Sequence, residues 1–343
     1  MENYSKYKGK GLSGLQNLGN TCFINSTIQC MFNVYELNDT IDNINLEEKI
    51  NDKPDSVLLL EWNKLREMVW NENCIISPGG FVSNVKKISK IKDKDLFTGW
   101  AQNDLPEFLF FLLDCFHNAL CREVNMTISG KVENEKDRMA KICYEMMQKM
   151  YKKEFSEILT LFYGIHVSNI VSLEDKILSS CPEPFLNISL PIPNKKNINL
   201  YDCFDLYTES EELKGENSWF NEKTNKKEDV TKKLLFWSLP TIMILDLKRF
   251  TQTLNKNNAM IDIPLNNLDM RKYVNEYNSE SYVYDLFGVC NHFGNVNNGH
   301  YTSFIRNAND NWYHYDDMNV DQVKDTNLII SSNAYCLFFR KKK

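Results

Sequence analysis

The sequence predicts an α+β fold, with helices in the first half of the chain and antiparallel strands in the second half. Apolar residues recur at helical spacing before residue 160. After residue 239, short runs rich in Val, Ile, Tyr and Phe are separated by turns that contain Asn and Gly. Strands and helices do not alternate, so βαβ units are not expected. The 343 residues suffice for one large domain or two average ones.

Three helical segments are expected in the first half. The first covers residues 21–32, where Ile24, Ile28 and Met31 share one side of the helix. The second covers residues 104–120, which read DLPEFLFFLLDCFHNAL. Asp104 can cap this helix, with a proline in the first turn and a capping-box-like glutamate three residues after the cap. The third, rich in Lys, Glu and Met, is expected over residues 131–160.

Strands are expected in five later segments, at residues 239–247, 284–290, 300–306, 312–316 and 335–340. Residues 208–233 are polar and charged and are expected to form a solvated extension with a hairpin. Residues 1–10 are expected to be a flexible tail. No long linker or internal repeat is apparent after Gly11.

Composition argues against several classes of function. The formal net charge is −6, whereas a nucleic-acid-binding protein usually has a basic face, so no nucleic-acid partner is expected. The closing RKKK is expected to be a solvated tail. No apolar run reaches membrane-spanning length, and the first eleven residues, MENYSKYKGKG, lack the apolar core of a secretory signal. We therefore expect no membrane partner and a location in the cytoplasm or the nucleus. We also expect a monomer.

Ten cysteines are spread along the chain at positions 22, 30, 74, 115, 121, 143, 181, 203, 290 and 336. None of them forms a CxxC pair, so the spacing does not predict a zinc site. Without a secretory signal, reduced thiols are the simplest interpretation.

Cys22 lies in NLGNTCFINSTIQC, residues 17–30, where the first helix is expected to begin. Most free cysteines are buried and behave as small apolar residues, and that interpretation suits this position. A helix N-terminus also favours a thiolate, because its free N–H groups and its dipole stabilise negative charge. A nucleophilic Cys22 would further need a histidine that the fold brings close.

His300 is the strongest candidate for that histidine. It follows the turn at residues 297–299 and opens the strand HYTSFIR, which would aim its ring reproducibly. Asp316 and Asp317 end the next expected strand, and only one of them can face His300, because adjacent strand residues point to opposite sides. A facing carboxylate would fix the tautomer of the imidazole. The alternative is a hydrogen-bonded structural histidine. The other histidines are His117, His166, His292 and His314.

Several ordered blocks resemble the ubiquitin-specific proteases. Residues 14–32, GLQNLGNTCFINSTIQCMF, are similar to the family's cysteine box, GL-x-N-x-GNTC-[YF]-x-NS-x-x-Q. Residues 285–317 resemble its histidine box, with GHY and an aromatic-Asp-Asp. Residues 102–114 resemble its Q-x-D-x-x-EFL helix, and LPTIMILDLKRF at 239–250 resembles its LP…KRF strand. The resemblance runs from about residue 11 to residue 339.

The resemblance implies a papain-like cysteine protease fold with a helical thumb and with palm and fingers of antiparallel strands. One catalytic domain would span residues 11–343, after the tail at 1–10. Its thumb would cover approximately residues 11–160, its fingers 161–235 and its palm 236–343.

The resemblance also implies roles for site residues. Cys22 would be the nucleophile and His300 the general base. Asp316 would orient His300, with Asp317 as the second choice or as a residue that polarises the site. Asn17 and the backbone N–H of Cys22 would form an oxyanion hole, in which losing one donor typically costs ~10²–10³ in rate. The alternative for Asn17 is an ordinary turn residue.

Further positions would hold the substrate. Asp104 and Glu107 match acidic residues that bind the extended basic tail of ubiquitin in the family, and helix capping is an equal alternative for both. Phe250, His292 and Tyr301 match positions that line a narrow channel near the scissile bond. Such a channel would admit Gly-Gly and reject side chains. Core packing is the alternative for the aromatic residues.

One family feature is missing. Many members carry two CxxC pairs that bind a structural zinc in the fingers. This chain has SLED at residues 172–175 and FNEKTNK at 220–226 in those places. We therefore expect no zinc and no other cofactor, with fingers that are held by packing or are mobile.

The implied function is that of a deubiquitinating thiol protease. It would hydrolyse the isopeptide or peptide bond after the C-terminal Gly of ubiquitin, with ubiquitin and ubiquitinated proteins as partners. Three alternatives are the same chemistry on another ubiquitin-like protein, a ubiquitin-binding pseudoenzyme, and a scaffold in which Cys22 only packs. Pseudoenzymes often lose the Cys, the His or the Asn of the site, and all three positions are filled here.

Overall fold

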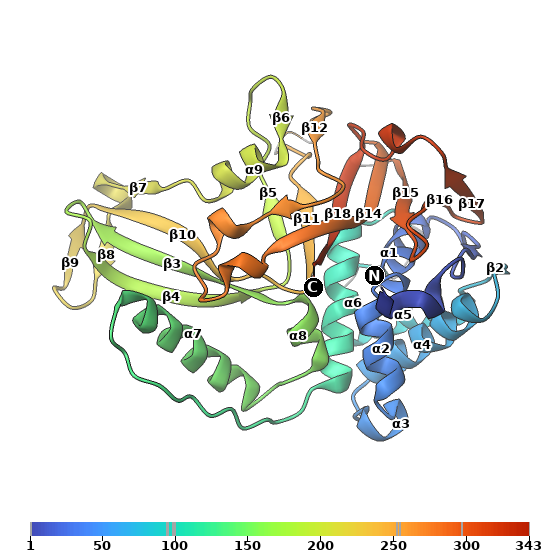
Figure 1. Ribbon diagram of the computed structural model, residues 1–343, viewed down its shortest axis with the longest axis horizontal. Coiled ribbons are helices and arrows are strands. Elements are labelled where there is room, and N and C mark those ends of the chain that lie inside the picture. Colours follow the sequence, from blue (N-terminus) through green and yellow to red (C-terminus); the bar gives the residue numbers. More distant parts are fainter. Residues whose placement is uncertain are drawn as a thin grey trace.

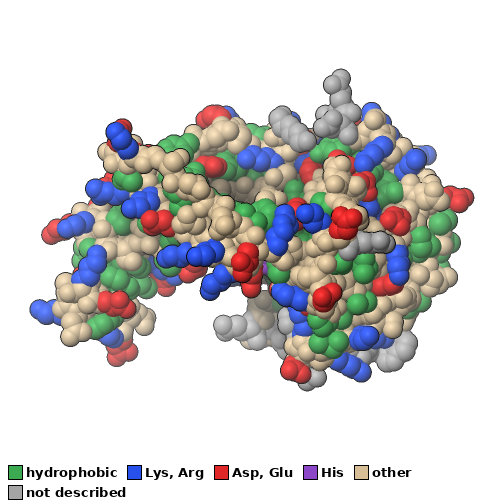
Figure 2. Space-filling model, turned by 90° about the horizontal axis from the view of Figure 1, so that it is seen from below, with side chains coloured by type: hydrophobic (Ala, Val, Ile, Leu, Met, Phe, Trp, Pro, Cys, Tyr) green, Lys and Arg blue, Asp and Glu red, His purple; other side chains and the backbone are tan. Residues whose placement is uncertain are grey.

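The computed structural model describes residues 2–93, 96–97, 101–251, 253, 255–295 and 298–342. Helices α1 to α6 gather on one side, an eight-stranded sheet packs against them, and a four-stranded sheet projects on the far side (Figure 1). In the space-filling view the outline is notched between this projecting lobe and the rest, and side chains of both charges are mixed over the visible face (Figure 2). The predicted α+β class is confirmed.

The helices follow the apolar periodicity of the sequence. Their bounds are α1 (Cys22–Phe32), α2 (Tyr35–Asn43), α3 (Leu46–Lys49), α4 (Asp55–Asn71), α5 (Gly79–Ile91), α6 (Leu105–Leu120), α7 (Glu135–Tyr151), α8 (Glu157–Phe162) and α9 (Leu200–Tyr207). The first two predicted helices are α1 and α6, each displaced by one residue at its start. The helical segment expected at 131–160 is present as α7 and α8, with an interruption at residues 152–156. Residues between α7 and α8 pair with an earlier segment instead, through reciprocal backbone hydrogen bonds between Arg122 and Phe155.

The eight-stranded sheet has the order β17-β16-β15-β14-β18-β11-β5, with β13 beside β14. Its strands are β5 (Ile188–Leu190), β11 (Ile242–Leu247), β13 (Leu268–Asp269), β14 (Val283–Gly294), β15 (Gly299–Arg306), β16 (Trp312–Asp316), β17 (Asn319–Val323) and β18 (Ala334–Lys341). All five predicted strands are present. Strand β14 is longer than predicted, so that His292 lies opposite Tyr301 of β15.

The four-stranded sheet has the order β4-β3-β10-β7. Its strands are β3 (Gly164–Ser172), β4 (Ile177–Phe185), β7 (Glu211–Leu213) and β10 (Val230–Ser238); β8 (Trp219–Asn221) and β9 (Lys226–Glu228) form a separate hairpin, and the short pairs are β1 (Gly14–Leu15) with β2 (Ile75–Ile76) and β6 (Ile198–Asn199) with β12 (Ile261–Asp262). The hairpin expected within 208–233 is present. Most of residues 208–233 are exposed, as expected for a solvated extension, and from Val230 onward they begin β10, which pairs with β3 and β7.

The boundary expected between fingers and palm is crossed by β5. This strand lies within the range 161–235 yet pairs in parallel with β11 of the eight-stranded sheet. The other proposed subdomain bounds stay a prediction.

Helix α1 is the central element of the larger core. All of its residues are buried, because it lies between α6 and the face of the sheet that carries β14, β15 and β16. This packing fixes the first residue of α1 next to the start of β15. No described helix is long and apolar enough to cross a membrane.

The flexible tail expected at residues 1–10 is wrong in its central part. A 3-10 helix covers Glu2–Tyr7, and the side chain of Tyr7 is only 3% exposed. The Tyr7 ring stacks on Tyr35 at a centroid distance of 4.7 Å and meets Trp70 edge-on at the same distance. Polar composition suggested solvation, whereas the rings of Tyr4 and Tyr7, which both pack on Tyr35, dock the segment.

Candidate active site

Cys22 is the first residue of α1 and is 3% exposed. Burial is the main influence on its thiol and raises its pKa above the ordinary value, and the charge of Asp317 acts in the same direction. Interaction with the backbone of Tyr301 lowers the pKa, as does interaction with the backbone of Cys22 and Phe23 at the start of the helix. The helix start therefore acts as predicted, but desolvation is the larger effect in this state.

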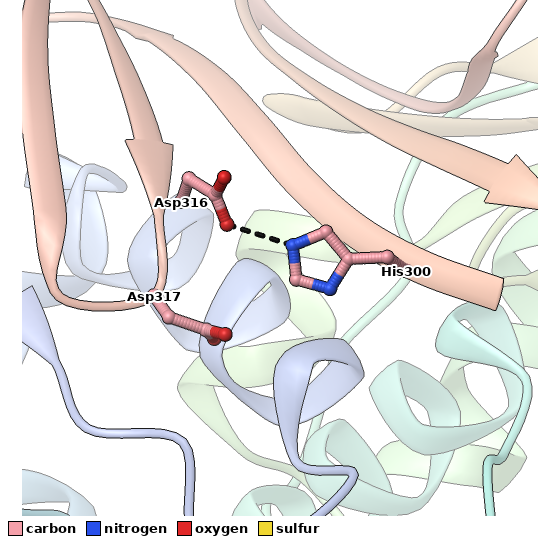
Figure 3. A group of neighbouring side chains, drawn as sticks. All are labelled: His300, Asp316 and Asp317. Carbon is pink, nitrogen blue, oxygen red and sulfur yellow. Dashed lines mark hydrogen bonds and ion pairs between the residues drawn. The ribbon is translucent and has the colours of Figure 1, made fainter.

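His300 and Asp316 form a hydrogen-bonded pair. His300 is the second residue of β15 and Asp316 is the last residue of β16, and Nε2 of the ring lies 2.7 Å from Oδ1 of the carboxylate (Figure 3). A proton on Nε2 satisfies this bond, so Nδ1 holds the free lone pair. Nδ1 points away from Asp316 (Figure 3). Among the described residues, no hydrogen bond joins the ring to the sulfur of Cys22.

Asp317 forms hydrogen bonds with Asn17 and Asn25 and not with His300. It lies in the turn after β16 with φ 50°, and its Oδ2 and Oδ1 accept hydrogen bonds from the side-chain amides of Asn17 and Asn25, at 2.9 and 2.7 Å. The Oδ1 of Asn17 in turn accepts from the backbone N–H groups of Gly19 and Thr21 at 3.0 and 3.2 Å. The amide of Asn17 is thus held in one orientation beside the start of α1, and it has a second hydrogen to offer a ligand.

Gly14 lets the chain reach this turn. A Cβ at that position would lie 2.0 Å from the carbonyl oxygen of Met318, so no side chain fits. The backbone N–H of Leu15 donates to the carbonyl of Asp317 at 2.8 Å. Gly14 therefore allows the segment that carries Asn17 to lie against the turn at residues 317–318.

Four rings pack beside the start of β15. They belong to Phe250, His292, Tyr301 and Tyr335, and the closest centroids, those of His292 and Tyr301, are 4.8 Å apart. Burial, with a contribution from the charge of Lys256, lowers the pKa of His292 to about 4. His292 is therefore neutral at pH 7.

Asp104 caps α6 and also binds one of these rings. Its Oδ1 accepts from the backbone N–H of Glu107 at 3.1 Å, and its Oδ2 accepts from the hydroxyl of Tyr335 at 2.5 Å. Burial raises the pKa of Asp104, against the effect of both hydrogen bonds. Glu107 is exposed. The capping role is confirmed for Asp104, and substrate contact stays a prediction.

Three contacts were not foreseen. Tyr335 was expected only as a strand residue, and Asn25 only as part of the cysteine box. Gln102 lies in the Q-x-D motif, and its side chain bonds the backbone of Gly299 next to His300. For Asn25 and Gln102 the motif match was a signal, since both are polar residues at fixed motif positions.

His300, Asp316 and Asp317 offer ligand atoms within 4.8 Å of one another, close enough to surround a metal ion. The imidazole and Asp316 are bonded to each other, and Asp317 holds two amides. These polar partners match a catalytic arrangement, in which Nε2 of His300 and one oxygen of Asp316 are bonded to each other.

The family model of the ubiquitin carboxyl-terminal hydrolases matches residues 13–339. This chain belongs to that family. The ubiquitin carboxyl-terminal hydrolase 2 of Bos taurus is 32% identical over 350 residues, which cover 96% of this chain and 55% of that protein. The human hydrolase 21 is 30% identical over 99% of this chain and 63% of its own length. This member of the family thus spans about half the length of the curated relatives it matches.

Solved structures share the fold. The SAGA Ubp8/Sgf11/Sus1/Sgf73 DUB module bound to ubiquitin aldehyde contains a chain with a TM-score of 0.74 and 25% identity, covering 99% of this chain and 71% of that chain. The module bound to monoubiquitin gives a TM-score of 0.72 at 24% identity, over 97% and 70% of the two chains. The resemblance to ubiquitin-specific proteases and the papain-like fold class are thereby confirmed.

Proposed function

We propose that this chain is a deubiquitinating thiol protease that cleaves the isopeptide or peptide bond after the C-terminal Gly of ubiquitin. The observation that carries the proposal is the position of Asp317 among the groups of the site: it accepts from the amide of Asn17, its charge acts on the Cys22 thiol, and its carboxylate lies within 4.8 Å of ligand atoms of the His300–Asp316 pair. Membership of the hydrolase family supports it.

His300 is the general base in this proposal. Because burial raises the pKa of Cys22, the resting thiol is protonated, and Nδ1 of the imidazole takes its proton when the substrate is in place. The hydrogen bond from Nε2 to Asp316 stabilises the imidazolium that results. Bringing the ring into contact with the sulfur is therefore part of the catalytic cycle.

The thiolate of Cys22 then attacks the carbonyl carbon of the terminal Gly. The oxyanion accepts hydrogen bonds from the side-chain amide of Asn17 and from the backbone N–H of Cys22. His300 gives its proton to the leaving amine, and a thioester to ubiquitin is left. Water, deprotonated by His300, releases ubiquitin and restores the thiol.

The tail of the substrate is proposed to run between the helical side and the rings. Asp104 and Glu107 supply negative charge at the start of α6 for a basic tail. Phe250, His292 and Tyr301 form a tightly packed wall beside Cys22, which suits glycine residues without side chains. No cofactor is needed for this chemistry, and we propose that none is bound.

The test is release of a fluorophore from the C-terminus of ubiquitin by the wild type, Cys22→Ala and His300→Ala. We expect turnover by the wild type and a loss of at least ~10³-fold in each variant, since both groups act in the same step. Equal activity of the wild type and Cys22→Ala would contradict the proposal.

A ubiquitin probe with a C-terminal electrophile separates the alternatives. An active thiolate forms a covalent adduct with it. Binding of ubiquitin without adduct or turnover would identify a pseudoenzyme. If ubiquitin neither binds nor reacts, the same assay with other ubiquitin-like proteins decides whether the modifier is a different one.

A further inference from the structure

The side chain of Gln102 forms two hydrogen bonds with the backbone of one residue, Gly299, across the boundary between helices and sheet. Its side-chain Nε2 donates to the carbonyl of Gly299 at 2.5 Å, and its Oε1 accepts from the N–H of the same glycine. Gln102 lies just before α6, whereas Gly299 opens β15. The amide thus takes both backbone groups of Gly299, as a neighbouring strand would.

The grip lies on an edge of β15 that β16 leaves uncovered. Strand β16 pairs with β15 only between Ser303 and Arg306. In an extended strand, the N–H groups of every second residue point to the same edge. The N–H groups of Gly299 and Tyr301 therefore share one edge. Gln102 binds the first, and interaction of the second with Cys22 lowers the pKa of the thiol.

Gly299 is confined from another direction as well. A Cβ there would lie 2.3 Å from Nε2 of His292 and 2.8 Å from the carbonyl oxygen of Phe293. The glycine thus fills a slot between the buried imidazole and Gln102. Replacing Gln102 by a residue without an amide therefore removes both hydrogen bonds that hold the Gly299 backbone from the helical side.

We propose that Gln102 is a positioning residue for the reaction. By fixing Gly299 it sets where β15 begins, and so where the His300 imidazole and the Tyr301 N–H stand relative to Cys22. For its effect on turnover this inference rests on the proposed function. The placement itself is a property of the free protein and is measured without ubiquitin.

The kinetic test compares Gln102→Ala with Asn103→Ala in ubiquitin–fluorophore hydrolysis. Asn103 is the matched control, because its side chain donates to the Ala101 carbonyl within its own loop. We expect Gln102→Ala to lower kcat by ~10- to 100-fold, the cost of a misplaced catalytic group, with little change in KM. Asn103→Ala keeps the wild-type kcat. Thermal unfolding of both variants checks that the fold is retained.

Gln102→Glu gives a signature that a general loss of stability would not. An ionised carboxylate accepts from the Gly299 N–H but repels the Gly299 carbonyl. A protonated carboxyl both accepts and donates, as the amide does. The ratio of its kcat to that of the wild type should therefore rise as the pH falls through the pKa of the introduced carboxyl. A kcat ratio that does not change with pH would contradict a role for the paired hydrogen bonds between residue 102 and Gly299.

Alkylation of Cys22 by iodoacetamide, followed by mass spectrometry of its peptide, tests the placement in free protein. Because the Tyr301 N–H lowers the pKa of the thiol, its displacement in Gln102→Ala should move the midpoint of the alkylation–pH curve upward. If only the accessibility of the thiol changed, the alkylation rate would change by the same factor at every pH and the midpoint would stay the same. Unchanged midpoint and unchanged kcat would overturn the inference. Absent turnover in the wild type would overturn the proposed function, and the midpoint would still decide on Gln102.

Discussion

At the scale of single residues, two adjacent carboxylates face different partners. Asp316 ends a strand and bonds His300, whereas the next residue has a left-handed backbone that turns its carboxylate toward Asn17 and Asn25. A positive φ at Asp317 is uncommon for a residue other than glycine, and Asp and Asn tolerate it best. The turn therefore divides the acids between the base and the oxyanion side.

Asp316→Asn and Asp317→Asn should both slow turnover, for different reasons. Asparagine at 316 removes the charge that stabilises the imidazolium and allows the wrong tautomer, at a cost of ~10²–10⁴ in kcat. Asp317 accepts from two side-chain amides, and asparagine, which has one acceptor oxygen, would lose one of them. If the lost partner is Asn17, kcat should fall by ~10²–10³. Because the charge of Asp317 raises the pKa of Cys22, only Asp317→Asn should move the alkylation midpoint to lower pH. Equal midpoints in the two variants would contradict this division.

His292 should make the fold sensitive to acid. Its pKa is about 4 in the folded protein and 6.5 in its ordinary state, so the unfolded chain takes up a proton first as the pH falls. The stability that depends on neutral His292 is therefore complete above pH 6.5 and is lost between pH 6.5 and 4. Between pH 7 and 5 the loss is about 2 kcal/mol. Urea unfolding of the wild type and His292→Phe measures it, since the phenylalanine variant should lose less stability over this interval.

At the scale of elements, the start of α6 joins helix capping to the rings of the site. Asp104 satisfies the N–H of Glu107, which the helix cannot pair itself, and also accepts from Tyr335 of β18. The same carboxylate therefore fixes the start of a helix and a side chain of the sheet. The negative charge of Asp104 is a separate property. In the proposed function this charge attracts the basic tail of the substrate.

Asp104→Asn separates these two properties. Asparagine is as good an N-cap as aspartate, so the free energy of unfolding should stay within ~0.5 kcal/mol of the wild type. The lost charge should raise KM for ubiquitin several-fold while kcat changes little, because the charge acts on binding of the tail and takes no part in breaking the bond. Asp104→Ala should instead cost about 1 kcal/mol of stability. An unchanged KM in Asp104→Asn would leave capping as the role of this residue.

At the scale of the whole molecule, the projecting lobe is closed at its tips by hydrogen bonds. In the β3–β4 turn, Oγ of Ser172 accepts from the backbone N–H groups of Glu174 and Lys176 at 3.3 and 3.2 Å. In the β8–β9 hairpin, the side chains of Asn221 and Thr224 donate to Glu228. These are the places where many relatives are expected to bind zinc through CxxC pairs.

We predict that the purified protein carries no stoichiometric zinc and that a chelator does not change its stability. Carboxylate and amide side chains at the tips are poor substitutes for the thiolates of a structural zinc site. Elemental analysis and thermal unfolding with and without EDTA measure this. A family member with both CxxC pairs is the control and should lose stability with EDTA. One zinc per chain, or a lower Tm with EDTA, would show that another ligand set exists.

Local chemistry made much of the molecule predictable. Helical periodicity and the Asp104 cap located α1 and α6, and β-rich runs located the strands of the larger sheet, because these signals depend on neighbours in sequence. The motif blocks also named Cys22 and His300 as a pair. The tail at residues 1–10 was misjudged, since the burial of Tyr7 depends on Tyr35 and Trp70, which no local pattern reveals.

The sequence by itself determined which side chains are available for chemistry and which segments form helices and strands. The resemblance ranked Asp316 before Asp317 as the partner of His300, and only the tertiary structure shows that the positive φ at Asp317 turns the second carboxylate to Asn17 and Asn25 instead. Likewise, Gln102 meets Gly299 across 197 residues of chain, a contact that exists only because packing of the helices against the sheet closes so large a loop. Long-range contacts of this kind leave no periodic trace in the sequence.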